Sequence, residues 1–153
     1  MPELPEAETI TRALNRTLKK RKIKKVEIFA PKLRTPLKPL CTAKLEGRAF
    51  TGIGNIYAAE TLFACGIRPQ RPASRLTRSE CDAIVREAKR ILKLAIKWGG
   101  TTVHDFRSVD GSEGKFVQKL KIYAQKQCPV CGTAVAKVTL GGRTSWYCPK
   151  CQK

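Results

Sequence analysis

The sequence has few acidic residues and no long apolar run. Only 12 Asp and Glu stand against 31 Lys and Arg in 153 residues, which gives a formal net charge of +19 at pH 7. No segment is long and apolar enough to span a bilayer, and no amphipathic helix pairs a basic face with a bulky aromatic one. We therefore expect no membrane partner. A chain this basic repels itself unless a polyanion is nearby, which favours nucleic acid over the alternative of a merely soluble basic protein.

The N-terminus does not have the pattern of a secretory signal. Residues 1–6 read MPELPE, which is acidic and interrupted by proline, whereas a signal peptide starts with basic residues and continues with an apolar stretch. We therefore expect a cytoplasmic protein, associated with the nucleoid when it is on DNA. In that reducing compartment the seven cysteines are not expected to form disulfides.

The first region, residues 1–50, is too small to form a domain by itself. Short strands are predicted at residues 26–28 and 45–50, where apolar and charged residues alternate or a short apolar run occurs. One helix and two strands cannot cover a core, so this region either packs on the rest of the chain or has lost a part. The helix is predicted by four apolar residues at helical spacing: Ala7, Ile10, Leu14 and Leu18.

The second region, residues 51–127, is predicted to be mostly helical. A glycine turn leads to Asn55, the expected N-cap of a helix that Gly66 ends. Free N–H groups at the start of this helix form a predicted anion site, although an ordinary helix start explains the pattern equally well. A capping box at Thr77 begins a long helix that ends at Gly99. Its predicted apolar face consists of Ile84, Ala88, Ile91, Leu92 and Ala95.

The third region, residues 128–153, contains two C-x-x-C pairs that are separated by 16 residues. Each pair can bind one metal ion from a tight turn, and two pairs complete a tetrahedral thiolate shell, so we predict one structural zinc. Redox dithiols are the alternative. The predicted ligands are Cys128, Cys131, Cys148 and Cys151, whereas Cys41, Cys65 and Cys81 lack such spacing and are interpreted as ordinary structural cysteines.

A hairpin is predicted between the two cysteine pairs, with Gly141 and Gly142 at its turn. Arg143 follows the turn directly, so its guanidinium should project from the tip, where it can bind phosphate oxygens. A solvated turn arginine is the alternative, and the basic context favours the phosphate contact.

The N-terminus contains candidate catalytic residues. Pro2 becomes the first residue once Met1 is removed. An α-amino group has a pKa near 8, so part of it is uncharged at neutral pH and can act as a nucleophile toward an aldehyde-like sugar carbon. Glu3 and Glu6 lie close by in the sequence and could move protons. Taken alone, an unremarkable Pro- and Glu-rich start explains these residues better.

Four motifs together resemble the formamidopyrimidine-DNA glycosylase and endonuclease VIII family, and the formamidopyrimidine branch is the closer one. The resemblance covers nearly all residues of the chain. The motifs occur in the family's order: residues 1–9 (MPELPEAET), residues 52–58 (GIGNIYA) with Glu60, residues 99–102 (GGTT) with 110–111 (DG), and residues 142–148 (GRTSWYC).

The resemblance implies a bifunctional base-excision repair enzyme that acts on oxidised purines in double-stranded damaged DNA. Pro2 would attack C1′ of the nucleotide sugar through a Schiff base, and the strand would then be cleaved by abasic-site lyase activity. Glu3 and Glu6 would handle protons and sugar contacts. The DNA contacts implied are those of Asn55, Tyr57, Lys115 and Arg143, with residues 107–115 placed where the branch contacts the extruded base.

The chain departs from the family between Phe50 and Thr51. Most of a β-sandwich domain and the first helix of the helical domain lie at this point in the family, and the catalytic lysine and the residues that wedge behind the flipped base have no match. We therefore expect impaired activity, with a non-enzymatic, zinc-dependent DNA-binding module as the alternative. The expected protein is an α+β monomer with three parts: a truncated catalytic-domain remnant at 1–50, a helix-two-turn-helix domain at 51–127 and a four-cysteine zinc finger at 128–153.

Overall fold

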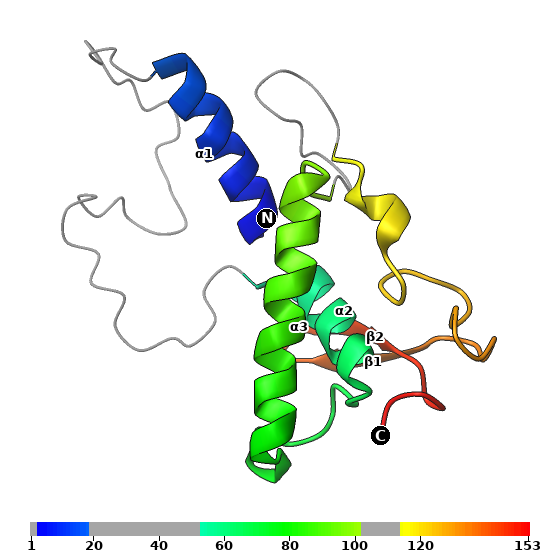
Figure 1. The fold of residues 1–153 in the computed structure, drawn as a ribbon. Coiled ribbons are helices and arrows are strands. Elements are labelled where there is room, and N and C mark those ends of the chain that lie inside the picture. The colour runs from blue at the N-terminus through cyan, green and yellow to red at the C-terminus, as the bar shows by residue number, and fades with distance from the viewer. Residues whose placement is uncertain (1–2, 19–52, 102–113) are drawn as a thin grey trace.

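The computed structural model describes residues 3–18, 53–101 and 114–153. The strands predicted at 26–28 and 45–50, as well as Pro2, Cys41 and most of the segment 107–115, lie outside the described residues. The chain folds as an α+β protein, as predicted (Figure 1). Its elements are α1 (Leu4–Leu18), α2 (Asn55–Cys65), the short 3₁₀ helix η1 (Ala73–Arg75), α3 (Arg78–Lys97), a second 3₁₀ helix η2 (Phe116–Lys119), β1 (Ala136–Leu140) and β2 (Arg143–Tyr147).

Helix α2 begins one residue earlier than the sequence predicts. Its N-cap is Gly54, which has extended backbone and no side-chain cap, so the expectation that Asn55 caps the helix is wrong. The predicted end at Gly66 is confirmed: this residue has φ of 69°, in the left-handed region that glycine tolerates without strain. Its N–H bonds to the carbonyl of Phe63 at 3.1 Å, which closes the last turn.

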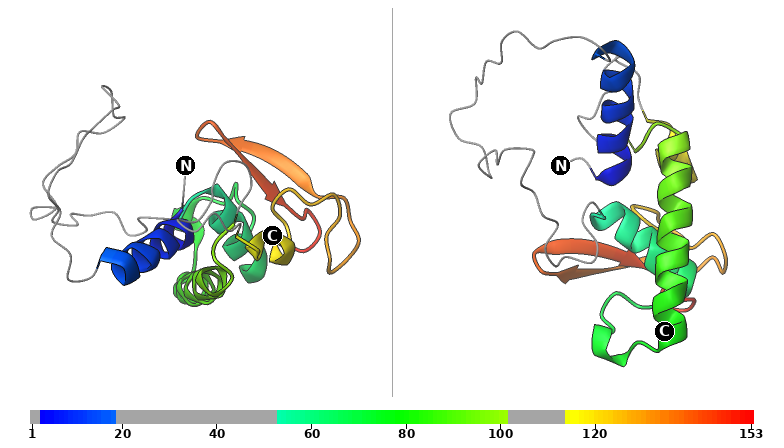
Figure 2. Two further views of the ribbon diagram at one scale, coloured as in Figure 1. Left: turned by 90° about the horizontal axis from the view of Figure 1, so that it is seen from above. Right: turned by 60° about the vertical axis from the view of Figure 1, so that its left-hand side comes forward.

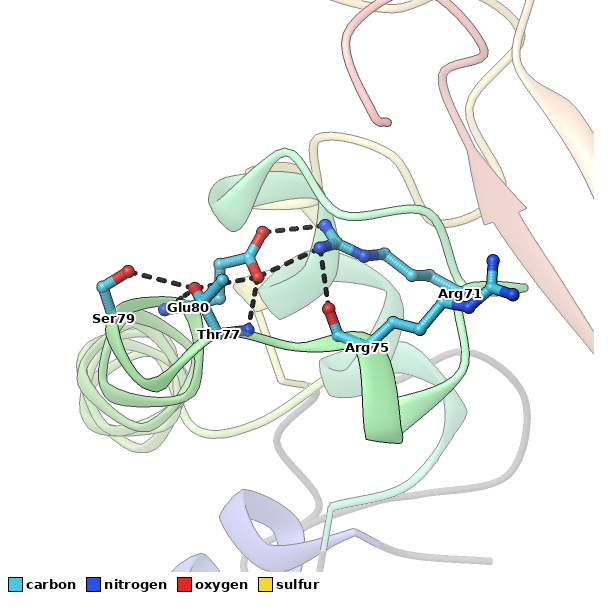
Figure 3. A network of polar contacts seen from close by, with 5 residues as sticks. All are labelled: Arg71, Arg75, Thr77, Ser79 and Glu80. Atoms are coloured by element: carbon cyan, nitrogen blue, oxygen red, sulfur yellow. Dashed lines mark hydrogen bonds and ion pairs between the residues drawn. The ribbon is translucent and has the colours of Figure 1, made fainter.

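Helix α3 begins with the predicted capping box. The Thr77 hydroxyl accepts a hydrogen bond from the Glu80 N–H at 3.3 Å, and the Glu80 carboxylate accepts one from the Thr77 N–H at 2.8 Å. Arg71 donates to both oxygens of Glu80, at 2.7 and 3.1 Å, and to the carbonyl of Arg75 at 3.0 Å (Figure 3). The start of α3 is thus tied to the turn that follows α2.

Helix α2 is central because two apolar clusters pack on it. Its Tyr57 ring stacks on Phe116 with ring centroids 6.0 Å apart. Helix α2 lies between α1 and the β-hairpin (Figure 2). The first cluster joins α2 to α3 and η2 through Tyr57, Ile91, Ala95, Phe116 and Leu120; the second joins it to the C-terminal segment through Ala59, Phe63, Ile122, Cys128 and Cys148.

Helix α1 packs near the C-terminal end of α3 with only its first turn buried. Pro5 and Glu6 are buried, whereas Ala7 is exposed and Leu14 keeps 40% of its surface exposed. The apolar stripe that predicted this helix is therefore only partly covered by the described residues. Within the described part of the chain, no helix is both long and apolar enough to cross a membrane.

Candidate DNA-binding site and metal centre

The four predicted zinc ligands converge. The Sγ atoms of the four cysteines all lie within 4.8 Å of one another. The Cys128–Cys151 and Cys131–Cys148 Sγ pairs are 3.8 and 3.5 Å apart, close to the edge of about 3.8 Å that a tetrahedral zinc–thiolate shell requires. Hydrogen bonding with Thr133 lowers the pKa of the Cys131 thiol, whereas hydrogen bonding with the neighbouring thiols raises the pKa of Cys151. The donor set and its geometry fit one zinc ion.

The predicted hairpin is confirmed, and it places Arg143 at its tip. Strands β1 and β2 pair in antiparallel register, with Leu140 opposite Arg143 and Ala136 opposite Tyr147. The two glycines between the strands have positive φ values of 55° and 75°, as a tight turn of this type needs. The Arg143 side chain is exposed.

The end of the finger is fixed to the C-terminal end of α2 by a fully buried glutamine. Gln152 accepts a hydrogen bond from the Cys148 N–H at 2.8 Å and donates one to the carbonyl of Ile67 at 2.7 Å. Arg68 donates to the carbonyl of Gln152 at 2.8 Å. A zinc ligand is therefore linked through one side chain to the loop after α2.

The start of the finger segment is fixed to α2 by Glu60. This side chain is only 5% exposed, and its carboxylate accepts hydrogen bonds from the backbone N–H groups of Lys121, Ile122 and Tyr123 at 2.9–3.0 Å. A buried carboxylate is stabilised when several donors surround it, so this bonding holds the turn at residues 121–123 against the helix. From the sequence, Glu60 was known only as a residue that accompanies the GIGNIYA motif, and its structural role was not predicted.

The predicted anion site at the start of α2 exists, but a side chain of this protein fills it. The Glu3 carboxylate accepts hydrogen bonds from the N–H groups of Gly54 at 2.9 Å, Ile56 at 3.0 Å and Tyr57 at 3.3 Å. Burial raises the pKa of Glu3, while these three N–H groups oppose that shift by stabilising the charged form. The N–H groups predicted to bind a phosphate are thus used to attach α1.

Glu6 joins three segments that are far apart in the sequence. One carboxylate oxygen, Oε1, accepts hydrogen bonds from the Tyr57 hydroxyl at 2.8 Å and the Thr101 N–H at 2.7 Å. The other, Oε2, accepts one from the Glu3 N–H at 2.9 Å. Glu6 is 3% exposed, so the start of α1, the first turn of α2 and the segment that follows α3 meet at one buried charge.

Tyr57 is a buried partner of this charge. Its side chain is 0% exposed, and its predicted contact with DNA stays a prediction. Burial raises the pKa of its hydroxyl, which therefore stays protonated and can donate to Glu6. Its oxygen also lies 2.9 Å from the Thr101 hydroxyl. In the sequence Thr101 belongs to the GGTT motif, and nothing near it identifies it as a partner of Glu6.

Asn55 and the tip of the hairpin come together. The Asn55 side-chain amide donates a hydrogen bond to the carbonyl of Thr144, the residue after Arg143. Asn55 is thus bonded to the neighbour of Arg143 across the junction of helical domain and finger. Lys115 is also exposed, and its N–H donates to the carbonyl of Trp98 at 3.0 Å. The DNA contacts of Asn55, Lys115 and Arg143 stay predictions.

The two ends of the segment 102–113 leave the fold side by side. Thr101 and Lys115 form an isolated antiparallel bridge. Next to it, Gly114 lies so close to Gly100 that a Cβ on Gly114 would be 2.3 Å from the Gly100 carbonyl oxygen. Only glycine permits this approach.

Two family models match the chain. One describes the H2TH domain of formamidopyrimidine-DNA glycosylase and matches residues 19–107, and the other describes a zinc finger found in FPG and IleRS and matches residues 125–153. The second match identifies the four-cysteine cluster as a zinc finger, which confirms the prediction of one structural zinc.

Curated relatives are named formamidopyrimidine-DNA glycosylase. The protein of Pasteurella multocida is 47% identical over 116 residues, which cover 74% of this chain and 43% of that relative. The protein of Haemophilus influenzae is 43% identical over 129 residues, covering 83% of this chain and 48% of the relative. The chain thus spans less than half the length of the relatives it matches.

Solved structures show the same likeness. The MutM (FPG) protein from Thermus thermophilus matches with a TM-score of 0.63 and 38% identity, covering 67% of this chain and 40% of that one. A complex of the Lactococcus lactis Fpg with DNA that contains an abasic site matches with a TM-score of 0.60 and 32% identity, covering 67% and 38%.

Proposed function

The chain belongs to the formamidopyrimidine-DNA glycosylase family, and from this premise we propose that it is a base-excision repair protein that binds damaged duplex DNA and cleaves it at abasic sites. Excision of oxidised purines, the activity in the family name, is impaired in this proposal. The relatives are more than twice as long as the part that matches. The resemblance also implies a hairpin lysine and wedge residues for which this sequence has no match.

The observation that carries the proposal is that α1 is still attached to the helical domain. Glu3 occupies the start of α2 and the buried Glu6 holds the Glu3 N–H, so residue 3 is fixed beside Asn55. Pro2, the proposed nucleophile, is covalently bonded to residue 3. In this proposal the amine acts at the same site as the phosphate contacts of Asn55 and Arg143.

The proposed chemistry requires little beyond a placed amine. The sugar of an abasic site opens to an aldehyde, and the Pro2 nitrogen adds to C1′ to form a carbon–nitrogen bond. Loss of the aldehyde oxygen as water leaves an iminium ion, and removal of a proton from C2′ then expels the 3′ phosphate. An α-amino group with a pKa near 8 is partly uncharged at neutral pH, so it can make the first bond. Glu3 and Glu6 are the proposed groups that move protons.

Binding to DNA rests on the charge and on the exposed tip of the finger. A net charge of +19 favours the phosphate backbone, and Arg143 presents a guanidinium that can bind two phosphate oxygens. Zinc, Glu60 and Gln152 hold this tip in a fixed relation to α2, so the arginine does not have to be ordered when DNA binds.

The deciding experiment is borohydride trapping of the purified chain on an abasic duplex and on an 8-oxoguanine duplex. We expect a covalent adduct with the abasic duplex, little with the 8-oxoguanine duplex, and loss of the adduct in Pro2→Gly. No adduct on either duplex would leave the alternative, a non-enzymatic DNA-binding module. Vigorous release of 8-oxoguanine would contradict the proposed impairment.

The DNA contact has its own test. Arg143→Ala should weaken binding to all duplex sequences and lower the slope of log affinity against log salt by about 1. Arg78→Ala is the matched control, because this arginine is exposed at the start of α3 and pairs with Asp82 at 3.6 Å. Equal affinities of the two variants would remove Arg143 from the contact.

A further inference from the structure

Helix α3 carries a row of basic residues on the side that faces away from the core. Its buried residues, Ala88, Ile91 and Ala95, share one face, and the last two belong to the cluster that joins α3 to α2 and η2. Within residues 86–97 the opposite side carries only basic residues, over an arc of about 100°. These residues are all exposed and are called the α3 basic stripe: Arg86, Lys89, Arg90, Lys93 and Lys97.

The stripe and the tip of the finger lie on opposite sides of α2. In both views of Figure 2, α2 lies between α3 and the β-hairpin. The stripe points away from α2, because the opposite face of α3 is the one that packs on it. A duplex held by Arg143 at the hairpin tip is therefore on the other side of the molecule from the stripe.

Most of the charge of the stripe is not neutralised within the fold. Glu87 pairs with Arg90 at 2.7 Å and, more loosely, with Arg86 at 3.9 Å. In residues 3–18, 53–101 and 114–153, no carboxylate forms an ion pair with any of the three lysines of the stripe. These lysines are four positions apart, where like charges on a helix repel one another. An external anion would relieve this repulsion.

The spacing of the lysines fits an extended polyanion. Residues four positions apart on a helix are separated by about 6 Å along its axis, so the three ammonium groups form a straight row of about 12 Å. A single small anion can contact only part of such a row, whereas a phosphate backbone repeats its charge along its length. A lysine acts as a point charge and needs no particular geometry, which suits a contact that does not depend on sequence.

Other partners of a basic face fit less well. A helix that binds a membrane surface places a broad apolar face beside its basic residues, and the apolar face of α3 is already buried in the core. The centre of a protein interface is enriched in aromatic residues, and α3 contains none. Nucleic acid therefore remains the partner that the stripe fits best.

We propose that the α3 basic stripe is a second contact for the phosphate backbone of duplex DNA, so that one chain holds two duplex segments at once. The proposal rests on the DNA binding proposed above for the finger tip, but it does not depend on catalysis. A chain that binds a second segment before it releases the first can pass between neighbouring segments of DNA without entering solution.

The test is capture of a second duplex. The parent chain is bound to an undamaged duplex on beads, and a fluorescent duplex of the same sequence is added after washing. We expect the parent to retain the fluorescent duplex. The triple variant Lys89→Gln, Lys93→Gln, Lys97→Gln should retain about tenfold less, because each lost phosphate contact weakens binding. Its binding to the bead duplex should change less than about threefold. Glutamine has nearly the helix propensity of lysine, so α3 should stay folded.

A matched control removes the same charge from another part of the surface. Arg12→Gln, Arg16→Gln, Arg75→Gln changes three exposed arginines that lie outside both α3 and the finger. Capture should stay within about twofold of the parent value, because net charge alone acts equally in both triple variants. An equal loss in the two variants would assign the effect to net charge and overturn the proposal. Zinc content and thermal unfolding verify that both variants are folded.

The remaining outcomes also decide the question. No capture by the parent chain overturns the proposal, and parent-like capture by the lysine variant does so too, because another surface or a second copy of the chain then holds the second duplex. Binding of anionic lipid vesicles that needs the three lysines, without capture of a second duplex, would assign the stripe to a membrane surface. Borohydride trapping on an abasic duplex should be parent-like in the lysine variant. Absence of trapping by the parent would overturn the lyase proposal and leave the stripe unaffected.

Discussion

The zinc finger and helix α1 are both attached to α2 by carboxylates that accept backbone hydrogen bonds, yet the two attachments differ in what supports them. Glu60 holds three backbone N–H groups ahead of the finger, and Glu3 holds three at the start of α2. Around Glu60 lies an apolar cluster that includes Phe63, Ile122 and two cysteines. Around α1 much of the apolar stripe is uncovered, with Leu14 at 40% exposure.

This difference shows that hydrogen-bonded carboxylates specify where an element sits, whereas buried apolar area and metal supply most of the stability. A hydrogen bond to a charged group contributes about 1.5–3 kcal/mol, and a buried large apolar side chain contributes a similar amount for each residue. The finger has both contributions and α1 has mainly the first. We therefore expect α1 to detach more easily than the finger.

Removing a zinc ligand should have the largest effect. Cys148→Ser deletes a thiolate whose residue is 0% exposed and whose N–H is held by Gln152. Structural zinc contributes about 10–16 kcal/mol in small fingers, so residues 128–153 should unfold and bound zinc should be lost. Metal analysis and hydrogen exchange of the hairpin amides measure both. Cys81→Ser, at an exposed cysteine outside the cluster, is the control and should retain zinc.

Glu60→Gln should have the next largest effect. The NH₂ group of the amide must take the place of Oε2, which faces the Lys121 N–H, or of Oε1, which also faces the N–H groups of Ile122 and Tyr123. In either case two donors face each other. We expect a loss of about 2 kcal/mol in the free energy of unfolding, measured with denaturant, together with faster exchange at residues 121–123. Glu87→Gln is the control. It removes a surface ion pair with Arg90 and should change the free energy of unfolding by less than about 0.5 kcal/mol.

Glu3→Gln should release α1 and leave the finger in place. We expect faster hydrogen exchange along α1, no change in zinc content, and a smaller loss of stability than in Glu60→Gln, about 1 kcal/mol. In the parent chain the amides of α1 should already exchange faster than those of α3 around Ile91. Equal protection of the two helices would show that α1 is as firmly held as α3 and would contradict this prediction.

The smallest effect concerns the start of α3, and it depends on pH. The Thr77 N–H, followed by Arg71, lowers the pKa of Glu80. The folded state therefore binds the proton less tightly than the unfolded chain, so this contribution to stability is present above the ordinary glutamate pKa of about 4.3 and is lost as the pH falls. Glu80→Gln should lower the melting temperature slightly at pH 7 and not at pH 3. A loss of equal size at both pH values would contradict this.

The parts of the fold predicted from the sequence are those determined by neighbours in the chain. The capping box at Thr77, the stop at Gly66 and the paired cysteines each depend on residues within a few positions, so their types and spacing suffice. The hairpin follows for the same reason, because two glycines of positive φ determine its turn.

The parts that were missed depend on long-range pairs. The cap of α2 could not be identified locally, because its donors are satisfied by Glu3, about fifty positions earlier. The hydrogen bonds of the Tyr57 hydroxyl with Glu6 and Thr101 could not be predicted either, because both partners lie more than forty positions away in the sequence. Periodicity likewise predicts that α1 is amphipathic but does not reveal that no described residue covers much of its apolar face.

The contact of Gly114 with Gly100 also determines how the chain can be altered. Since residues 101 and 115 are bridged, a peptide spliced between them enters and leaves the fold at one point. The entropy of closing such a loop grows only slowly with its length, so an epitope or a fluorescent reporter inserted there should leave the melting temperature nearly unchanged. A single methyl group at Gly114 should be tolerated less well than a whole inserted domain, because it would push the two ends apart.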